Sequence, residues 1–243
     1  MPERKGKGRN FAVNRRFKGV VLFMLLSVLA GMSRGCHGSA GAEDIAITDV
    51  QPANPDHKEL VDHLKLYDGL PENTVYDFYH IAGNSYNELC DQIFNKQTGK
   101  GSWNEQEKCR YAAEAMYCYT WDGDYDWHGD TVRWKNIRVG IKNSINFPWW
   151  DCPQNADKSM VEKWQKFIVS LKDHEFGHVR VYNVKGEEFK KTMASIEARS
   201  PWELRAKTQK AFSDFIVSVD AAGIDYDSTT GHGRSEGAVF SRN

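Results

Sequence analysis

The stretch Asp173-His174-Glu175-Phe176-Gly177-His178 lies in the middle of a long segment with helical periodicity, and it contains the pattern His-Glu-x-x-His. Two histidines four residues apart project from one face of a helix, one turn from each other. Both imidazoles can therefore reach one zinc ion, and the glutamate between them can take a proton from a water on the metal. The pattern predicts a Zn2+ site on this helix.

The apolar residues around this motif predict a helix whose motif face turns inward. They recur at spacings of three, four or seven, which is the repeat of one helical stripe. Imidazoles on such a face need polar partners, since an unsatisfied buried polar group costs about 1–3 kcal/mol. Gly177 also indicates the close approach of another group, because glycine inside a helix costs about 1 kcal/mol relative to alanine. The stripe consists of Trp164, Ile168, Leu171, His178, Tyr182, Phe189, Met193 and Ile196.

The first part of the chain has the layout of a secretory signal peptide. Residues 1–18 are basic, residues 19–32 are apolar, and a stretch of small residues ends at Ala42. We expect cleavage after Ala42. The apolar run is shorter than the about 20 residues of a membrane span, although an uncleaved anchor is the alternative. The mature protein is thus expected to be secreted or periplasmic, with no membrane span.

The charge of the mature chain argues against nucleic acid as a partner. Residues 1–42 hold 8 of the 32 basic and 1 of the 33 acidic residues, so cleavage leaves 24 basic and 32 acidic residues. An acidic protein is poorly suited to bind nucleic acid or an anionic membrane surface.

Four cysteines remain after the expected cleavage: Cys90, Cys109, Cys118 and Cys152. An even number of cysteines in an oxidising compartment predicts two disulfide bonds. Cys109 and Cys118 are an odd number of residues apart on an expected strand, so they should face opposite sides and not pair with each other. A cysteine zinc site is the alternative, but the sequence has no Cys-x-x-Cys pair.

The remaining pattern predicts an α+β fold in one domain, residues 74–243, after an irregular, proline-containing lead-in at residues 43–73. A small antiparallel or mixed sheet should pack on the long motif-bearing helix and on a second, C-terminal helix. The long helix is expected to bend or break near Gly186, since it far exceeds the usual length. The expected elements are a strand at 75–81, a helix at 86–94 capped by Ser85, strands at 111–121 and 137–147, and helices at 157–199 and 201–221.

The two longer strands are separated by the acidic segment 122–130, which begins Asp-x-Asp-x-Asp like a calcium loop. The sixth position is Trp127 and the twelfth is Arg133, where a helical calcium hand needs glycine and glutamate. We therefore expect a solvated hairpin connection here and no calcium site.

A catalytic zinc needs a third protein ligand, because it usually has three and keeps one position for water. His232 is the preferred candidate, since Gly231 and Gly233 on either side permit close backbone approach. The alternative is a solvated histidine near a frayed terminus. Tyr226 could donate its hydroxyl to an oxyanion or could simply be packed. Other acidic candidates are Glu197, if the long helix breaks, and Glu203, Asp214 and Asp220.

The mature chain resembles the bacterial domain-of-unknown-function family 922, whose members are described as predicted secreted zinc-dependent proteases. The resemblance covers about residues 74–240 and includes the histidine motif and the His232-Gly233 pair. It is carried by Tyr79-x-x-x-Gly83, Leu89, Pro148-Trp149, Trp164, His174-Glu175-Phe176-Gly177-His178, Asp227-x-x-Thr230-x-His232-Gly233 and Gly237-Ala238.

The resemblance implies a zincin-like metallopeptidase that acts on a peptide or protein substrate. His174, His178 and His232 would hold zinc, and Glu175 would be the general base that later protonates the leaving amine. A strand edge near Ile137–Phe147 could align the substrate by strand addition. The competing hypothesis is a non-catalytic exported binding or envelope protein, in which a closed metal site with four protein ligands, or a packed histidine cluster, only stabilises the fold.

Overall fold

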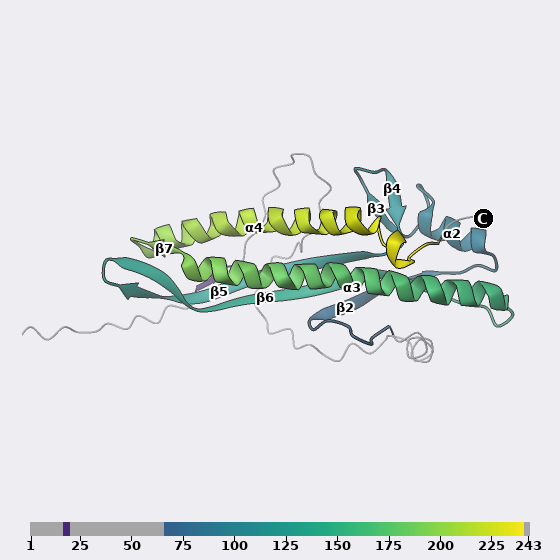
Figure 1. Ribbon diagram of the computed structural model, residues 1–243, viewed down its shortest axis with the longest axis horizontal. Coiled ribbons are helices and arrows are strands. Elements are labelled where there is room, and N and C mark those ends of the chain that lie inside the picture. Colours follow the sequence, from purple (N-terminus) through teal and green to yellow (C-terminus); the bar gives the residue numbers. More distant parts are fainter. Residues whose placement is uncertain (1–16, 20–65, 241–243) are drawn as a thin grey trace, which may run out of the picture.

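Two long antiparallel strands, β5 (Glu114–His128) and β6 (Thr131–Trp150), form the centre of the fold. They are seen in a computed structural model that describes residues 17–19 and 66–240 (Figure 1). Buried residues alternate along the first half of β5, so one face of the sheet is turned toward the core. Both expected strands are therefore present, and both are longer than the sequence pattern indicates.

The sheet is mixed because β2 (Thr74–Ile81) runs parallel to the second half of β6. The strand order is β1–β5–β6–β2, where β1 (Phe17–Gly19) is antiparallel to β5 and β7 (Glu197–Ala198) pairs with the start of β6. Helix α2 (Tyr86–Phe94) follows β2, and the Ser85 hydroxyl caps it as predicted. The predicted α+β class with a mixed sheet is confirmed.

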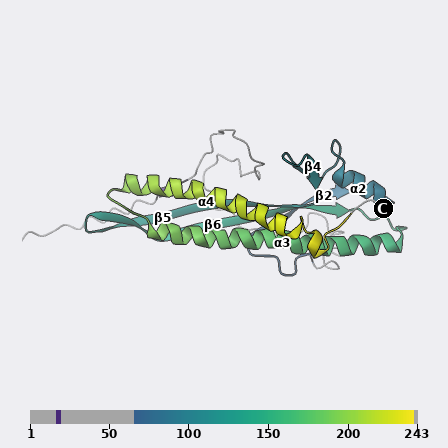
Figure 2. The same ribbon diagram turned by 45° about the horizontal axis from the view of Figure 1, so that its top comes forward.

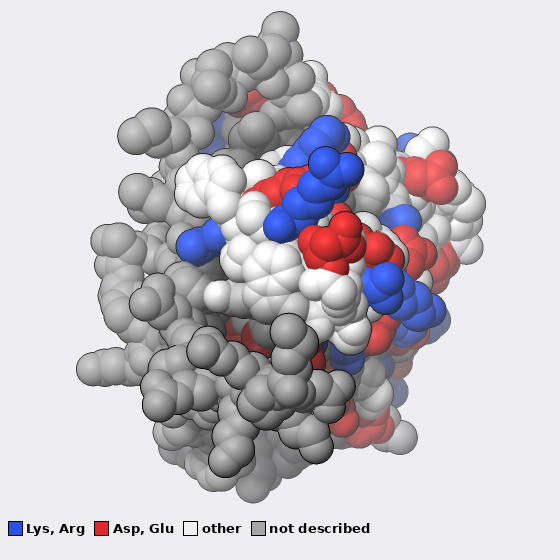
Figure 3. Space-filling model, turned by 90° about the vertical axis from the view of Figure 1, so that its left-hand side faces the viewer, with Lys and Arg blue, Asp and Glu red and all other residues white. Residues whose placement is uncertain are grey.

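Most of the acidic segment 122–130 belongs to the strands, so the predicted solvated hairpin connection is present but is shorter than expected. Strand pairing continues to His128↔Thr131, and the turn contains only Gly129 and Asp130. Basic residues opposite the aspartates explain this, because cross-strand ion pairs neutralise the carboxylates. Figure 3 shows acidic and basic side chains next to one another on the end of the molecule that carries this turn. The pairs are Asp122 with Arg138 at 2.6 Å and Asp126 with Lys135 at 3.3 Å.

Helix α3 (Lys158–Ser195) carries the histidine motif and is unbroken over its 38 residues. Its first turn is capped by the carboxylate of Asp157. The break expected at Gly186 is absent. A Cβ added at Gly186 would overlap the side chain of Ile141 on β6, so the glycine allows the helix to pack closely on the sheet.

Helix α4 (Pro201–Thr230) starts at the predicted Ser200-Pro201 signal but continues well past residue 221, and Gly231 ends it with φ of 59°. It runs back beside α3, and Figure 2 shows its C-terminal end close to the middle of that helix. The last turns of α4 therefore face the motif. Irregular structure begins only after Thr230.

A small hairpin and a C-terminal segment lie near the C-terminal end of α4. Strands β3 (Ser102–Asn104) and β4 (Cys109–Tyr111) form a separate two-stranded sheet near the C-terminal end of α4 (Figure 1). After α4, the 3₁₀ turn η1 (Arg234–Glu236) begins a segment that we call the C-terminal strap, residues 233–240. Phe240 at its end is buried in the core.

The two predicted disulfide bonds are not formed by the four cysteines of residues 66–240. Cys90 is buried in α2, Cys109 and Cys118 lie on β4 and β5, and Cys152 is exposed after β6. The cysteine count alone could not indicate that these thiols lie on four different elements.

The predicted signal peptide, residues 1–42, lies outside the described part of the chain except for β1. Of the lead-in, residues 66–73 are described and form turns and irregular structure up to β2. Within the described residues, no helix is both long and apolar enough to cross a membrane.

Candidate metal centre

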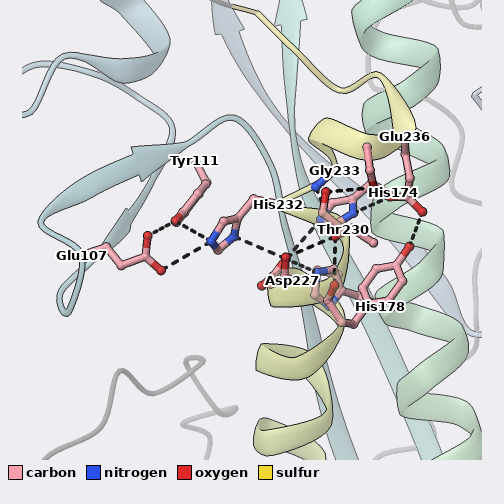
Figure 4. A network of polar contacts seen from close by, with 12 residues as sticks. Glu107, Tyr111, His174, His178, Asp227, Thr230, His232, Gly233 and Glu236 are labelled. Atoms are coloured by element: carbon pink, nitrogen blue, oxygen red, sulfur yellow. Dashed lines mark hydrogen bonds and ion pairs between the residues drawn. The ribbon is translucent and has the colours of Figure 1, made fainter.

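The two motif histidines and an aspartate from α4 converge on one point. His174 and His178 are buried on α3, with ring centres 4.9 Å apart. Their Nε2 atoms lie 3.2 Å and 3.0 Å from the same oxygen, Oδ1 of Asp227 in the last turn of α4 (Figure 4). Ligand atoms of all three side chains lie within 4.8 Å of one another.

This donor set suits a divalent cation. Two imidazole nitrogens and one carboxylate oxygen form the usual three-ligand protein set of a catalytic zinc, which leaves one coordination position for water or substrate. Ligand atoms that lie within 4.8 Å of one another are also close enough to bind one shared cation. The described residues thus include a group that can hold a metal ion.

The electrostatics of the group favour positive charge at its centre. Burial alone would raise the pKa of Asp227, but hydrogen bonds with His174 and His178 outweigh it and hold the pKa well below its usual value. Burial would lower the pKa of His174, but its contacts with Asp227 and Glu236 and the charge of Glu175 raise it. A proton or a metal cation can supply the positive charge that these carboxylates attract.

A second carboxylate fixes the orientation of His174. Its Nδ1 lies 2.9 Å from Oε2 of Glu236 in the C-terminal strap, and Oε1 of Glu236 accepts a hydrogen bond from the Tyr226 hydroxyl at 2.9 Å. The Tyr226 ring stacks on the His174 ring with centres 5.2 Å apart. A carboxylate on the far nitrogen of a metal-binding histidine sets its tautomer and increases its basicity.

Gly177 is explained by this second layer of contacts. A Cβ added at Gly177 would overlap the hydroxyl and ring of Tyr226. The close approach that the sequence indicated at this glycine is therefore the approach of Tyr226. The tyrosine hydroxyl is bound to Glu236, and Tyr226 is not among the residues that line the cleft described below. Its position fits a role in holding Glu236 and His174 better than the predicted contact with an oxyanion.

Glu175 is buried beside the two histidines. Burial raises the pKa of its carboxyl group, and the nearby His178 and His174 lower it in part. The backbone of Ala115 on β5 hydrogen-bonds to this carboxylate, while Oε2 is buried and has no partner among the described residues. A buried carboxylate with one unsatisfied oxygen and a raised pKa suits a general base.

His232, the predicted third ligand, borders the group and is not one of its three members. Its Nδ1 is 3.5 Å from Asp227 Oδ1. The other side of the ring faces the small hairpin, with Nε2 3.1 Å from the Tyr111 hydroxyl and 3.6 Å from Glu107 (Figure 4). The Tyr111 and His232 rings are stacked with centres 4.5 Å apart. Asp227 thus occupies the place that sequence reasoning gave to His232.

None of the other acidic candidates is a member of the group. Glu197 pairs with Arg133 at 2.6 Å at the far end of the unbroken α3, so it cannot return to the motif. Glu203 and Asp214 pair with lysines on α4, and Asp220 accepts a hydrogen bond from Tyr117. The sequence does not indicate Asp227 because the predicted helix ends at residue 221, before the turn that carries this aspartate, and no local pattern marks Glu236.

The metal group opens into a cleft of about 740 Å³ between α3, α4, the small hairpin and the start of β5. His174, Glu175, His178, Asp227 and His232 all line it. The segment 111–115 forms another part of its wall. The predicted docking strand, Ile137–Phe147, lies within β6 and pairs with β5 and, from Asn143, with β2, so β5 is the strand beside the cleft.

Residues 76–233 match the model of a family described as bacterial protein of unknown function, DUF922. The matched span includes the two histidines, Glu175, Asp227 and His232. No curated protein and no solved structure matches the chain.

Proposed function

Because the chain belongs to the DUF922 family, a bacterial family of unknown function, its activity has to be argued from the site, and we propose that it is a zinc-dependent peptidase. The proposal includes export, as the signal-like residues 1–42 indicate, so the enzyme would act in the periplasm or outside the cell. The substrate is a peptide or protein chain.

The observation that carries this proposal is the convergence of His174, His178 and Asp227 at the wall of an open cleft, with Glu175 beside them. Zinc held by these three side chains would act as a Lewis acid, lowering the pKa of a coordinated water toward 7 and polarising a substrate carbonyl. The donor set and the cleft support a site of the open, catalytic kind.

The protein's own groups supply the proton transfers. Glu175 takes a proton from the attacking water as the new C–O bond forms at the scissile carbonyl carbon, and it gives that proton to the leaving amine nitrogen as the C–N bond breaks. Its raised pKa, caused by burial, brings the carboxyl closer to the pH at which it must both accept and release a proton. Ala115 orients the carboxylate through its backbone hydrogen bond.

The backbone next to Ala115 gives the substrate a surface to lie on. Residues 111–115 line the cleft, and β5 continues from them. An extended peptide placed along this segment would cross the metal group, since Glu175 contacts the same strand.

The experiment that tests the proposal compares the wild type with Glu175→Gln. Both proteins, loaded with zinc, should bind about one zinc per chain, whereas the variant should lose hydrolysis of a fluorogenic casein substrate by a factor of at least about 10². Glu187→Gln, an exposed position on the same helix, is the matched control and should retain full activity. Equal turnover by wild type and Glu175→Gln would contradict the assignment.

A structural metal site is the second candidate, because His232 Nδ1 lies 3.5 Å from Asp227 and could supply a fourth protein ligand. In that case His232→Ala should lose zinc and stability together. For the proposed enzyme, the same variant should keep its zinc, as determined by elemental analysis after dialysis.

A further inference from the structure

The C-terminal strap, residues 233–240, follows α3 away from the metal group and contacts it about once per helical turn. Gly233 packs against His174, where an added Cβ would lie 3.0 Å from Cγ of the ring. Gly237 packs against Ser170 in the same way, at 3.0 Å from its Oγ. Phe240 then stacks on Phe167 with ring centres 4.7 Å apart. The strap thus forms a continuous wall along the helix.

This wall makes one end of the cleft apolar. Leu171 and Phe167 lie three and seven residues before His174, on the same face of α3, and both line the cleft. Val239 and Phe240 of the strap also line the cleft, and Ala112 adds a small side chain. The surface therefore changes from charged to apolar within about two helical turns of the metal group.

Apolar side chains around this cleft also reach solvent. Trp103 on the small hairpin is 40% exposed and Val239 is 50% exposed, and both line the cleft. Large exposed apolar side chains gathered around one concave site indicate that an apolar group of a ligand covers them.

From this arrangement, and resting on the proposed peptidase function, we infer that the protein selects peptides with a large apolar side chain, such as leucine or phenylalanine, next to the scissile bond. That side chain lies on the cleft surface formed by Leu171, Val239 and Phe240 while the peptide backbone passes the metal group. Because Glu236 of the same strap orients His174, one segment sets both the histidine geometry and the substrate preference.

The test uses short Ala/Ser peptides that differ at one position, which is leucine, phenylalanine, alanine or aspartate. Their affinities are measured by fluorescence anisotropy with zinc-loaded Glu175→Gln, which should not cut them, and the cut sites are mapped with the wild type by mass spectrometry. The leucine and phenylalanine peptides should bind at least about tenfold more tightly than the alanine and aspartate peptides. The cuts should fall beside the apolar residue.

A substitution in the apolar wall then tests its location. Val239→Asp, introduced into Glu175→Gln at an exposed position, should weaken binding of the leucine peptide about tenfold or more. Val217→Asp is the matched control, because Val217 is 68% exposed on α4 and does not line the cleft. The control should bind like its parent.

The outcomes separate this inference from the proposed function. If Glu175→Gln prefers apolar peptides and Val239→Asp removes that preference, but the wild type cuts none of them, the apolar subsite stands and the peptidase proposal fails. If the wild type cuts all four peptides equally and Glu175→Gln binds them equally, the apolar subsite is refuted while the peptidase proposal stands.

Discussion

Single atoms decide the chemistry of this site, and Oδ1 of Asp227 is the clearest case. Both histidine Nε2 atoms and His232 Nδ1 lie within 3.5 Å of it. A carboxylate surrounded by three imidazoles draws in positive charge, so protons and metal ions compete for the same place. The same competition applies to His174, which can bind a metal through Nε2 only when that nitrogen carries no proton.

Zinc binding should therefore release a proton. The carboxylates of Asp227, Glu175 and Glu236 overcome the effect of burial and raise the pKa of His174 above its usual value. In the metal-free protein, the protonated form of His174 therefore stabilises the folded state. This contribution is fully present below the unfolded-state pKa of about 6.5, and it is lost as the pH rises through the raised pKa of the folded state. Zinc affinity should thus increase with pH across this range.

Calorimetric titration in buffers with different ionisation enthalpies measures this linkage. Near neutral pH, we expect release of up to about one proton per zinc bound. If zinc affinity stays constant as the pH falls below the usual pKa of histidine, the assignment of His174 as a ligand is contradicted.

Two glycines of this region provide a test at the scale of one methyl group. Gly177→Ala should destabilise the protein by about 1–3 kcal/mol, despite better helix propensity, because the new Cβ displaces the Tyr226 ring. Gly223→Ala is the matched control on α4: its Cβ would meet only ordinary contacts of 3.7 Å or more, so it should stabilise by up to about 1 kcal/mol. Urea denaturation of both metal-free variants measures the difference, and equal effects would exclude the Tyr226 clash.

At the scale of elements, the predictions that held are those that depend on local sequence. Ser85 before α2, Ser200-Pro201 before α4 and the alternation in β5 mark their elements without any distant contact. Two predictions failed because distant packing decides the outcome. Gly186 suggested a break, but it lies against Ile141 of β6, and the length of α4 depends on the packing of its last turns against α3.

The C-terminal strap should couple the packing of Phe240 to metal binding, because the same segment carries Glu236, which orients His174. Phe240→Ala removes a buried ring that contacts Phe167, Trp164 and Tyr86. If the strap stays in place, this change should lower the free energy of unfolding by about 3–5 kcal/mol. If the strap is released instead, the loss of stability should be smaller. His174 then loses its contact with Glu236, and zinc affinity should fall about 10–100-fold. Competition with a chromogenic chelator measures this affinity.

Glu236→Gln separates the two effects of Phe240→Ala. It should lower zinc affinity by a similar factor while leaving the packing of Phe240 intact. If Phe240→Ala costs stability yet retains full zinc affinity, the strap does not couple the two.

For the whole molecule, the sequence predicted the architecture and two of the three members of the metal group. The histidine motif, the α+β class and the family were accessible because they reside in contiguous or periodic patterns. Asp227 was not, since it lies 49 positions after His178 and joins the histidines only through the return of α4 along α3. The prediction of two disulfide bonds failed for the same reason. The number of cysteines can be read from the sequence, but the positions of their thiols depend on the tertiary fold.

Metal binding should therefore stabilise the whole fold, because the group joins α3 to α4. Zinc present at about 1,000 times its dissociation constant should add about 4 kcal/mol to the free energy of unfolding, and EDTA should remove that gain. Asp227→Asn should abolish most of the zinc-induced rise in Tm, since it replaces the charged ligand and weakens the only member of the group from α4. Asp225→Asn, an exposed position on the same turn, should keep the full rise in differential scanning fluorimetry. An equal rise in both variants would mean that zinc is held without Asp227, and His232 would then be the ligand from this end of the chain to test next.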